Sequence, residues 1–149
     1  MTAQTTRSLA AQLVENAEAV WNDGDLDAAD AFFVDDVVVH DVPHQRDYEG
    51  LDEFKAWVTE VRTAFPDFET EATSIIVGDG SVVSQWTATG THEGEMADLD
   101  IEPTGETITW EGVTVYTVDD EEVTEAWWYY DLAGMMVQLG VIPEPPARA

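Results

Sequence analysis

Hydrophobic positions in the first part of the chain repeat at helical spacing. A helix is predicted over residues 6–21 because its apolar residues recur every three to four positions: Leu9, Leu13, Ala17, Val20 and Trp21. The Asn-Asp-Gly-Asp segment that follows breaks this pattern, and Asp25 is placed to cap a short second helix that runs to Phe32. A short strand is expected over residues 36–41, and a third helix runs from Leu51 to Phe65, where Pro66 ends it.

After Pro66 the hydrophobic period changes from helical to two, and β-branched residues become frequent. This pattern predicts four long strands, over residues 68–77, 81–92, 107–118 and 122–130. Short turns at 78–80 and 119–120 indicate antiparallel hairpins. Residues 93–106 form a longer loop that could be a rim or lid, residues 131–139 a last helix, and the tail from about 143 to 149 is expected to fray.

Helices followed by a meander of long strands are typical of an α+β domain with its helices on one face of a sheet. Strands of this length curl, and a curled sheet closed by helices encloses a conical cavity. The length of 149 residues supports one hydrophobic core, so we expect a single domain over residues 1–149. The cavity is the expected place for function.

The charge balance is extreme. The chain has 32 Asp and Glu against 5 Lys and Arg, a formal net charge of −27. Such a charge repels itself in dilute buffer and is screened by molar salt, so we interpret the composition as an adaptation to a salt-filled cytoplasm in a halophilic cell. Six Trp, five Phe and four Tyr in periodic segments argue against an acidic disordered protein.

Several classes of partner are disfavoured by the same composition. Binding to nucleic acid or to an anionic membrane surface requires a cationic patch, and five scattered cations do not form one. No apolar run is long enough to span a membrane, and residues 1–14 lack the pattern of a secretion signal. The chain has no Cys, which excludes disulfides and thiolate chemistry. These features predict a cytoplasmic protein.

The segment from Val123 to Asp131 offers the most candidate chemistry. Alternation along a strand puts Glu125, Trp127, Tyr129 and Asp131 on one face and Trp128 and Tyr130, among others, on the opposite face. If the first set lines the cavity, Asp131 is a desolvated carboxyl whose raised pKa suits proton transfer. The alternative is that Asp131 caps the following helix, and the two roles are compatible.

Two histidines and five strand aromatics complete the candidate site. His92 ends a predicted strand and His40 ends the first one, and either imidazole could move a proton or hold a substrate oxygen. Five aromatic side chains could line a pocket for a flat ligand, although core packing explains them as well: Trp86, Trp110, Tyr116, Trp127 and Tyr129. A metal site at His40, Asp41 and His44 is disfavoured because the spacing gives no ligand geometry.

The order of elements and several motifs resemble the SnoaL-like polyketide cyclases, also called ester cyclases, of the nuclear-transport-factor-two-like superfamily. The resemblance extends from the first helix to Gly140. The most specific motifs are residues 90–94 (Gly-Thr-His-Glu-Gly), 103–105 (Pro-Thr-Gly), 123–127 (Val-Thr-Glu-Ala-Trp) with Asp131, and 138–140 (Gln-Leu-Gly). Weaker matches are residues 21–25 and 65–67.

This resemblance implies a cone-shaped α+β barrel, usually a homodimer, with a deep pocket for a small apolar molecule. It also implies an intramolecular aldol reaction without metal or cofactor, with Asp131 as general acid/base and His92 or His40 polarising an oxygen. The sequence departs from the family at Tyr129, where the cyclases carry His, and the fold hosts many unrelated activities. The resulting hypothesis is a lyase or isomerase of the cyclase type acting on an apolar carbonyl compound.

Two alternatives remain beside this hypothesis. The first is a non-catalytic protein that binds a small apolar ligand in the same fold. The second is an epoxide hydrolase of the same superfamily, which needs an Asp-Arg-Asp relay; the four long strands contain no Arg, so it ranks last.

The halophilic interpretation predicts that the protein unfolds when salt is removed, because the carboxylates then repel one another without screening. Circular dichroism during dialysis from molar potassium chloride into low-salt buffer should show loss of structure, with a thermal midpoint that rises with salt. A midpoint that does not change with potassium chloride concentration would contradict this interpretation.

Overall fold

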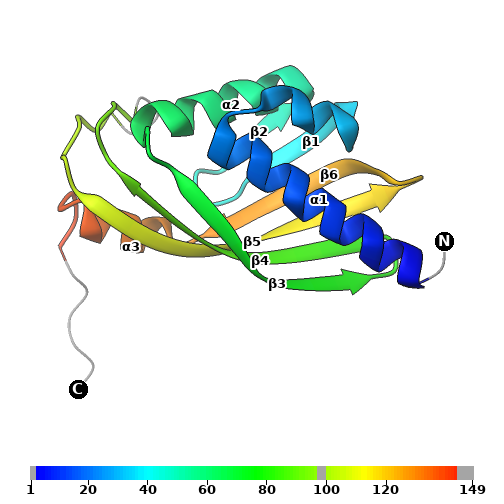
Figure 1. The fold of residues 1–149 in the computed structure, drawn as a ribbon. Coiled ribbons are helices and arrows are strands. Elements are labelled where there is room, and N and C mark those ends of the chain that lie inside the picture. Colours follow the sequence, from blue (N-terminus) through cyan, green and yellow to red (C-terminus); the bar gives the residue numbers. More distant parts are fainter. Residues whose placement is uncertain (1–2, 97–99, 144–149) are drawn as a thin grey trace.

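The computed structural model of the protein describes residues 3–96 and 100–143 (Figure 1). The frayed tail expected near the C-terminus therefore lies outside the described residues, except for residue 143. None of the described helices combines the length and the apolar character that a membrane crossing requires.

Two helices form a layer over one face of the sheet (Figure 1). Helix α1 (Ala3–Asp23) and helix α2 (Leu51–Ala64) each bury the apolar stripe that the sequence predicts, and a 3-10 helix, η1 (Leu26–Ala31), lies between them along the chain. Helix α2 begins after Gly50, whose φ of 93° is a conformation that glycine adopts without strain. The C-terminal helix α3 (Leu132–Gln138) packs beside the sheet at one end.

Six strands form the sheet, in the spatial order β2-β1-β6-β5-β4-β3. Their bounds are β1 (Phe33–Asp41), β2 (Arg46–Glu49), β3 (Glu69–Gly78), β4 (Ser81–Thr91), β5 (Thr107–Asp119) and β6 (Glu122–Tyr130). All neighbours pair antiparallel except β1 and β6, which are parallel. The four predicted long strands are present, and the mixed sheet with helices on one side confirms the predicted α+β class.

The sequence did not predict strand β2, and the reason is its composition. In Arg-Asp-Tyr-Glu only Tyr48 is buried, so this four-residue strand at the sheet edge carries almost no hydrophobic signal. It pairs antiparallel with β1, with Glu49 opposite Val38 at one end and Arg46 opposite Asp41 at the other. The short strand expected at residues 36–41 also begins earlier than predicted, at Phe33, whose ring joins the core.

Helix α1 is attached to strand β3 through polar contacts. The Asn22 side chain donates to the Thr70 carbonyl at 2.9 Å and accepts from the Thr70 amide at 2.7 Å, as a neighbouring strand would. The Ala72 amide donates to Glu18 Oε1 at 2.9 Å. These bonds satisfy backbone groups at the edge of the sheet and fix the helix over its face.

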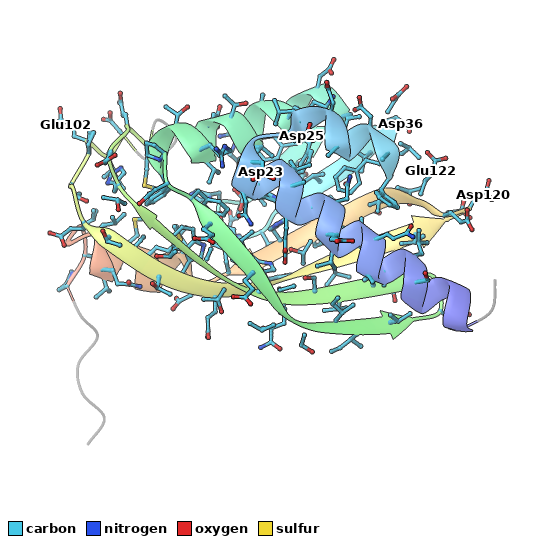
Figure 2. The ribbon with its side chains drawn as sticks, viewed as in Figure 1. Asp23, Asp25, Asp36, Glu102, Asp120 and Glu122 are labelled. Atoms are coloured by element: carbon cyan, nitrogen blue, oxygen red, sulfur yellow. The ribbon has the colours of Figure 1, made fainter. Side chains whose placement is uncertain are left out.

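The basic side chains that the structure describes are all engaged. Arg62 donates to the carbonyls of Trp21 and Asn22 at the end of α1, at 2.6 and 2.8 Å. Lys55 Nζ lies 2.8 Å from Asp30 Oδ1, and the Arg46 guanidinium lies over the ring of Tyr48. Of the acidic side chains labelled in Figure 2, Asp36, Glu102, Asp120 and Glu122 lie at the ends and edges of the molecule and point outward. Most of the negative surface therefore has no basic partner nearby to neutralise it.

Candidate active site

A cavity of about 270 Å³ lies between the helices and the facing side of the sheet. Aromatic rings supply a large part of its wall: Trp21, Trp57, Phe65, Phe68, Trp86, Trp110, Tyr116, Trp128 and Tyr130. Glu60 and Glu95 are exposed and also line it, so the cavity reaches the surface between α2 and the loop after β4. The predicted pocket is thus present, with a wall suited to an apolar, ring-containing molecule.

The five aromatic residues expected to bind substrate divide between the two faces of the sheet. Trp86, Trp110 and Tyr116 line the cavity. Trp127 and Tyr129 do not, because from Ala126 onward strand β6 turns its even-numbered residues inward, and Tyr129 is 43% exposed on the opposite face. The face with Trp127, Tyr129 and Asp131 is therefore the outer one, which corrects the assumption on which the pocket role of Asp131 depended.

Asp131 lies at the surface at the start of α3. Its Oδ1 accepts a hydrogen bond from the Gly134 amide at 2.9 Å, as a helix-capping aspartate does. The side chain is exposed and does not line the cavity. The structure thus shows the capping role and does not bring this carboxyl to the ligand space.

His92 is buried beside the cavity wall but does not line it. Its ring is fully buried and lies 5.5 Å from the Phe65 ring, while Nδ1 accepts from the Thr104 amide at 3.2 Å. The His92 amide donates to the Glu106 carbonyl, and the Gly105 amide donates to the His92 carbonyl, so both ends of the loop after β4 are bonded to this residue. Burial lowers the pKa of His92, and a bond with the Gly94 backbone opposes this shift only in part. In this position His92 fastens the loop after β4.

His40 lies on the outer face of the sheet, between two carboxylates. Nδ1 is 2.6 Å from Asp47 Oδ1 and Nε2 is 2.6 Å from Glu125 Oε2, and the ring stacks on Trp127 with 5.2 Å between centroids. Partial burial acts to lower the pKa of His40, but the bonds to Glu125 and Asp47 together outweigh it, so the pKa is raised above 6.5. His40 therefore joins β1, β2 and β6 away from the cavity.

A buried carboxylate, Asp41, and an imidazole, His44, meet at the cavity wall. Asp41 is 1% exposed at the end of β1, and its Oδ1 accepts from the Tyr130 hydroxyl at 2.7 Å. His44 Nδ1 lies 2.7 Å from that hydroxyl oxygen and 2.9 Å from Asp41 Oδ2. His44 and Tyr130 line the cavity, with Asp41 behind them. We name these three residues the Asp41 cluster.

Sequence reasoning considered Asp41 and His44 only as metal ligands and gave Tyr130 no role. His40 and Asp41 are neighbours on a strand, so their side chains point to opposite faces, and His44 follows the turn back to the side of Asp41. The spacing Asp41-Val-Pro-His44 at a strand end was the available signal. Tyr130 is 89 positions from Asp41, so only the fold brings the three together.

The geometry of the Asp41 cluster permits proton transfer at the cavity wall. When His44 Nδ1 carries a proton, that proton faces the Tyr130 oxygen and the Asp41 carboxylate, and Nε2 is left as an acceptor. A buried carboxylate behind an imidazole fixes the ring and stabilises the imidazolium once Nε2 takes a proton. This is the arrangement of a general base.

Comparison with known proteins identifies the family of the chain. The profile of the SnoaL-like polyketide cyclases matches residues 11–139, so the chain belongs to this family. No curated protein sequence matches it. TsrD from Streptomyces laurentii superposes with a TM-score of 0.82 at 20% identity, over 91% of this chain and 98% of that one. A candidate polyketide cyclase from Acidithiobacillus ferrooxidans superposes with a TM-score of 0.76 at 28% identity, over 94% of this chain and 98% of that one. AclR from Streptomyces galilaeus, a candidate hydroxylase, superposes with a TM-score of 0.78 at 26% identity, over 97% of this chain and 91% of that one.

The environment of His40 predicts a pH dependence of stability. Because its pKa is raised in the folded state, the imidazolium stabilises the fold fully below about pH 6.5, and this contribution is lost as the pH rises through the folded pKa. Denaturant unfolding of the wild type and of His40→Gln, measured from about pH 5 to pH 9, should give a free-energy difference that shrinks with rising pH. A difference independent of pH would show that His40 has no such role.

Proposed function

We propose that the protein is a cyclase- or isomerase-type enzyme that carries out acid/base chemistry on an apolar carbonyl compound held in the cavity. The observation that supports this most directly is the Asp41 cluster, a buried carboxylate joined to an imidazole and a phenol at the wall of an aromatic cavity. Membership of the SnoaL-like family is consistent with it. The acid/base role that the resemblance gave to Asp131 passes in this proposal to His44, with Asp41 behind it.

The proposed reaction begins with removal of a proton. His44 Nε2 takes it from the carbon next to a substrate carbonyl, which leaves an enolate and an imidazolium facing Asp41. The enolate carbon then attacks a second carbonyl carbon, and the alkoxide that forms takes the proton back from His44. The sum is an intramolecular aldol closure with no net gain or loss of protons; without the second carbonyl, return of the proton at another position gives an isomerisation.

Asp41 and Tyr130 act on this reaction through His44. The Tyr130 hydroxyl bonds to both partners, so it holds the imidazole at a fixed angle to the cavity. The aromatic side chains of the wall lower the local dielectric constant around His44, which strengthens the interaction of the imidazolium with Asp41. Asp41 is thus a positioning residue, and His44 is the proposed catalytic residue.

The same cavity supports a second candidate, a protein that binds a small apolar ligand without reacting it. The many aromatic side chains of the wall favour this alternative because they provide affinity without chemistry. The two candidates differ in whether replacing His44 removes a reaction or only alters binding.

Proton exchange on a simple ketone tests the catalytic proposal. The protein should speed exchange of the protons next to the carbonyl of 2-tetralone in D₂O, followed by proton NMR. His44→Gln should reduce this rate by about 100-fold or more, since general base catalysis contributes about 10² to 10⁴. Asp41→Asn should also reduce it, because the imidazole loses its carboxylate.

The matched control is Asp131→Asn, which changes the exposed cap and keeps a good capping residue. This variant should catalyse proton exchange on 2-tetralone at the wild-type rate. Thermal unfolding should show that His44→Gln, Asp41→Asn and Asp131→Asn are all folded. Full activity in His44→Gln, or loss of activity in Asp131→Asn alone, would refute the assignment. Binding of 2-tetralone with no exchange above buffer would favour the ligand-binding alternative.

A further inference from the structure

The charged groups on the cavity wall are all acidic. Among the described residues that line it, Glu18, Glu60 and Glu95 carry carboxylates and none is Lys or Arg. An anionic ligand would lose its hydration there and gain no Lys or Arg as a partner, in the field of a chain with a net charge of −27. The wall therefore disfavours carboxylate or phosphate groups on the part of the ligand that enters.

One tryptophan of the wall differs from the others in its exposure. Trp86 is half-buried, whereas four other tryptophans of the wall are at most 7% exposed: Trp21, Trp57, Trp110 and Trp128. Those four rings pack within the hydrophobic core. Trp86 lies on the inner side of β4 and keeps part of its indole open to the cavity.

Neighbouring residues hold the Trp86 indole against strand β5. Its Nε1 donates to Thr114 Oγ1 on β5 at 2.9 Å. Gly112 is the register partner of Trp86, and a Cβ at Gly112 would lie 2.6 Å from an indole carbon, so only glycine leaves room for the ring. On the next strand the Tyr130 ring lies 6.4 Å from the indole, between centroids. The indole thus extends across β5 toward the Asp41 cluster.

The cavity volume limits the size of the ligand. An apolar cavity of about 150 Å³ holds one benzene molecule. The cavity of about 270 Å³ is somewhat less than twice as large, which matches two fused rings with a small substituent. A larger planar molecule would have to extend through the mouth past Glu60 and Glu95.

We propose that the cavity takes an uncharged, planar compound of about two fused rings, which stacks on the indole of Trp86 with its carbonyl directed toward Tyr130 and His44. This inference rests on the proposed function, because it assigns the substrate class of the same site. Trp86 is then the binding platform, and Thr114 and Gly112 hold that platform in place.

Calorimetric titration with a matched series of probes tests the ligand class. 2-Acetonaphthone is uncharged and planar, 2-naphthoate carries the same rings with a negative charge, and 2-acetyldecahydronaphthalene has the same skeleton without planarity. The first should bind at least about tenfold more tightly than the second and several-fold more tightly than the third. Affinity should rise from acetophenone to 2-acetonaphthone and should not rise further for 1-acetylpyrene.

Variants locate the platform. Trp86→Leu keeps apolar bulk but removes the flat ring. It should therefore lower the affinity for 2-acetonaphthone by about tenfold and change the affinity for the decahydronaphthalene probe little. Thr114→Val removes the hydrogen bond to the indole and should lower the affinity for 2-acetonaphthone by a smaller factor. Trp127→Leu, on the outer face, is the matched control and should bind like the wild type.

The outcomes separate this inference from the proposed function. Tight binding of 2-naphthoate, affinity that keeps rising to 1-acetylpyrene, or unchanged 2-acetonaphthone binding in both folded Trp86→Leu and Thr114→Val would overturn the ligand class. The function would still stand if His44-dependent proton exchange remained. Conversely, the predicted binding pattern without any proton exchange would support the ligand class and refute the enzyme.

Discussion

The arrangement of the site depends on the register between strands β1 and β6. This parallel pairing places His40 opposite Trp127 and Asp41 opposite Trp128. Successive side chains on a strand point to opposite faces, so burial of Trp128 under the helices turns Asp41 and Tyr130 inward and His40, Trp127 and Tyr129 outward. A slip of one residue would exchange the two sets. The register thus decides which polar groups the cavity receives.

Much of the fold could be predicted from the sequence, because the hydrophobic period changes clearly from helical to two after Pro66. The four long strands and the helices follow from that change, while the polar edge strand β2 carries no such signal. The site could be predicted only in part. Both faces of β6 carry large aromatic residues, so alternation alone does not tell which face is inward. The contacts of Asp41 with Tyr130 come from tertiary structure alone.

The molecule separates its many carboxylates by environment. Those at the ends and edges of the sheet point into solvent (Figure 2), where salt screens their repulsion. Asp41, in contrast, is buried and contacts both a phenol and an imidazole. A buried carboxylate without donors would destabilise the fold. The Tyr130 hydroxyl that donates to Asp41 Oδ1 and the His44 imidazole 2.9 Å from Oδ2 are also the groups that Asp41 orients at the cavity. The same contacts therefore serve stability and the proposed chemistry.

The central claim is that Asp41 and Tyr130 hold the His44 imidazole with Nε2 free to accept a proton in the cavity. Nitrogen-15 NMR of histidine-labelled protein at neutral pH, assigned with His44→Gln, tests it most directly. We expect Nδ1 of His44 to carry the proton and the Nε2 resonance to shift when 2-acetonaphthone binds. A proton on Nε2 with Nδ1 unprotonated, or an Nε2 resonance that does not respond to the ketone, would contradict this claim.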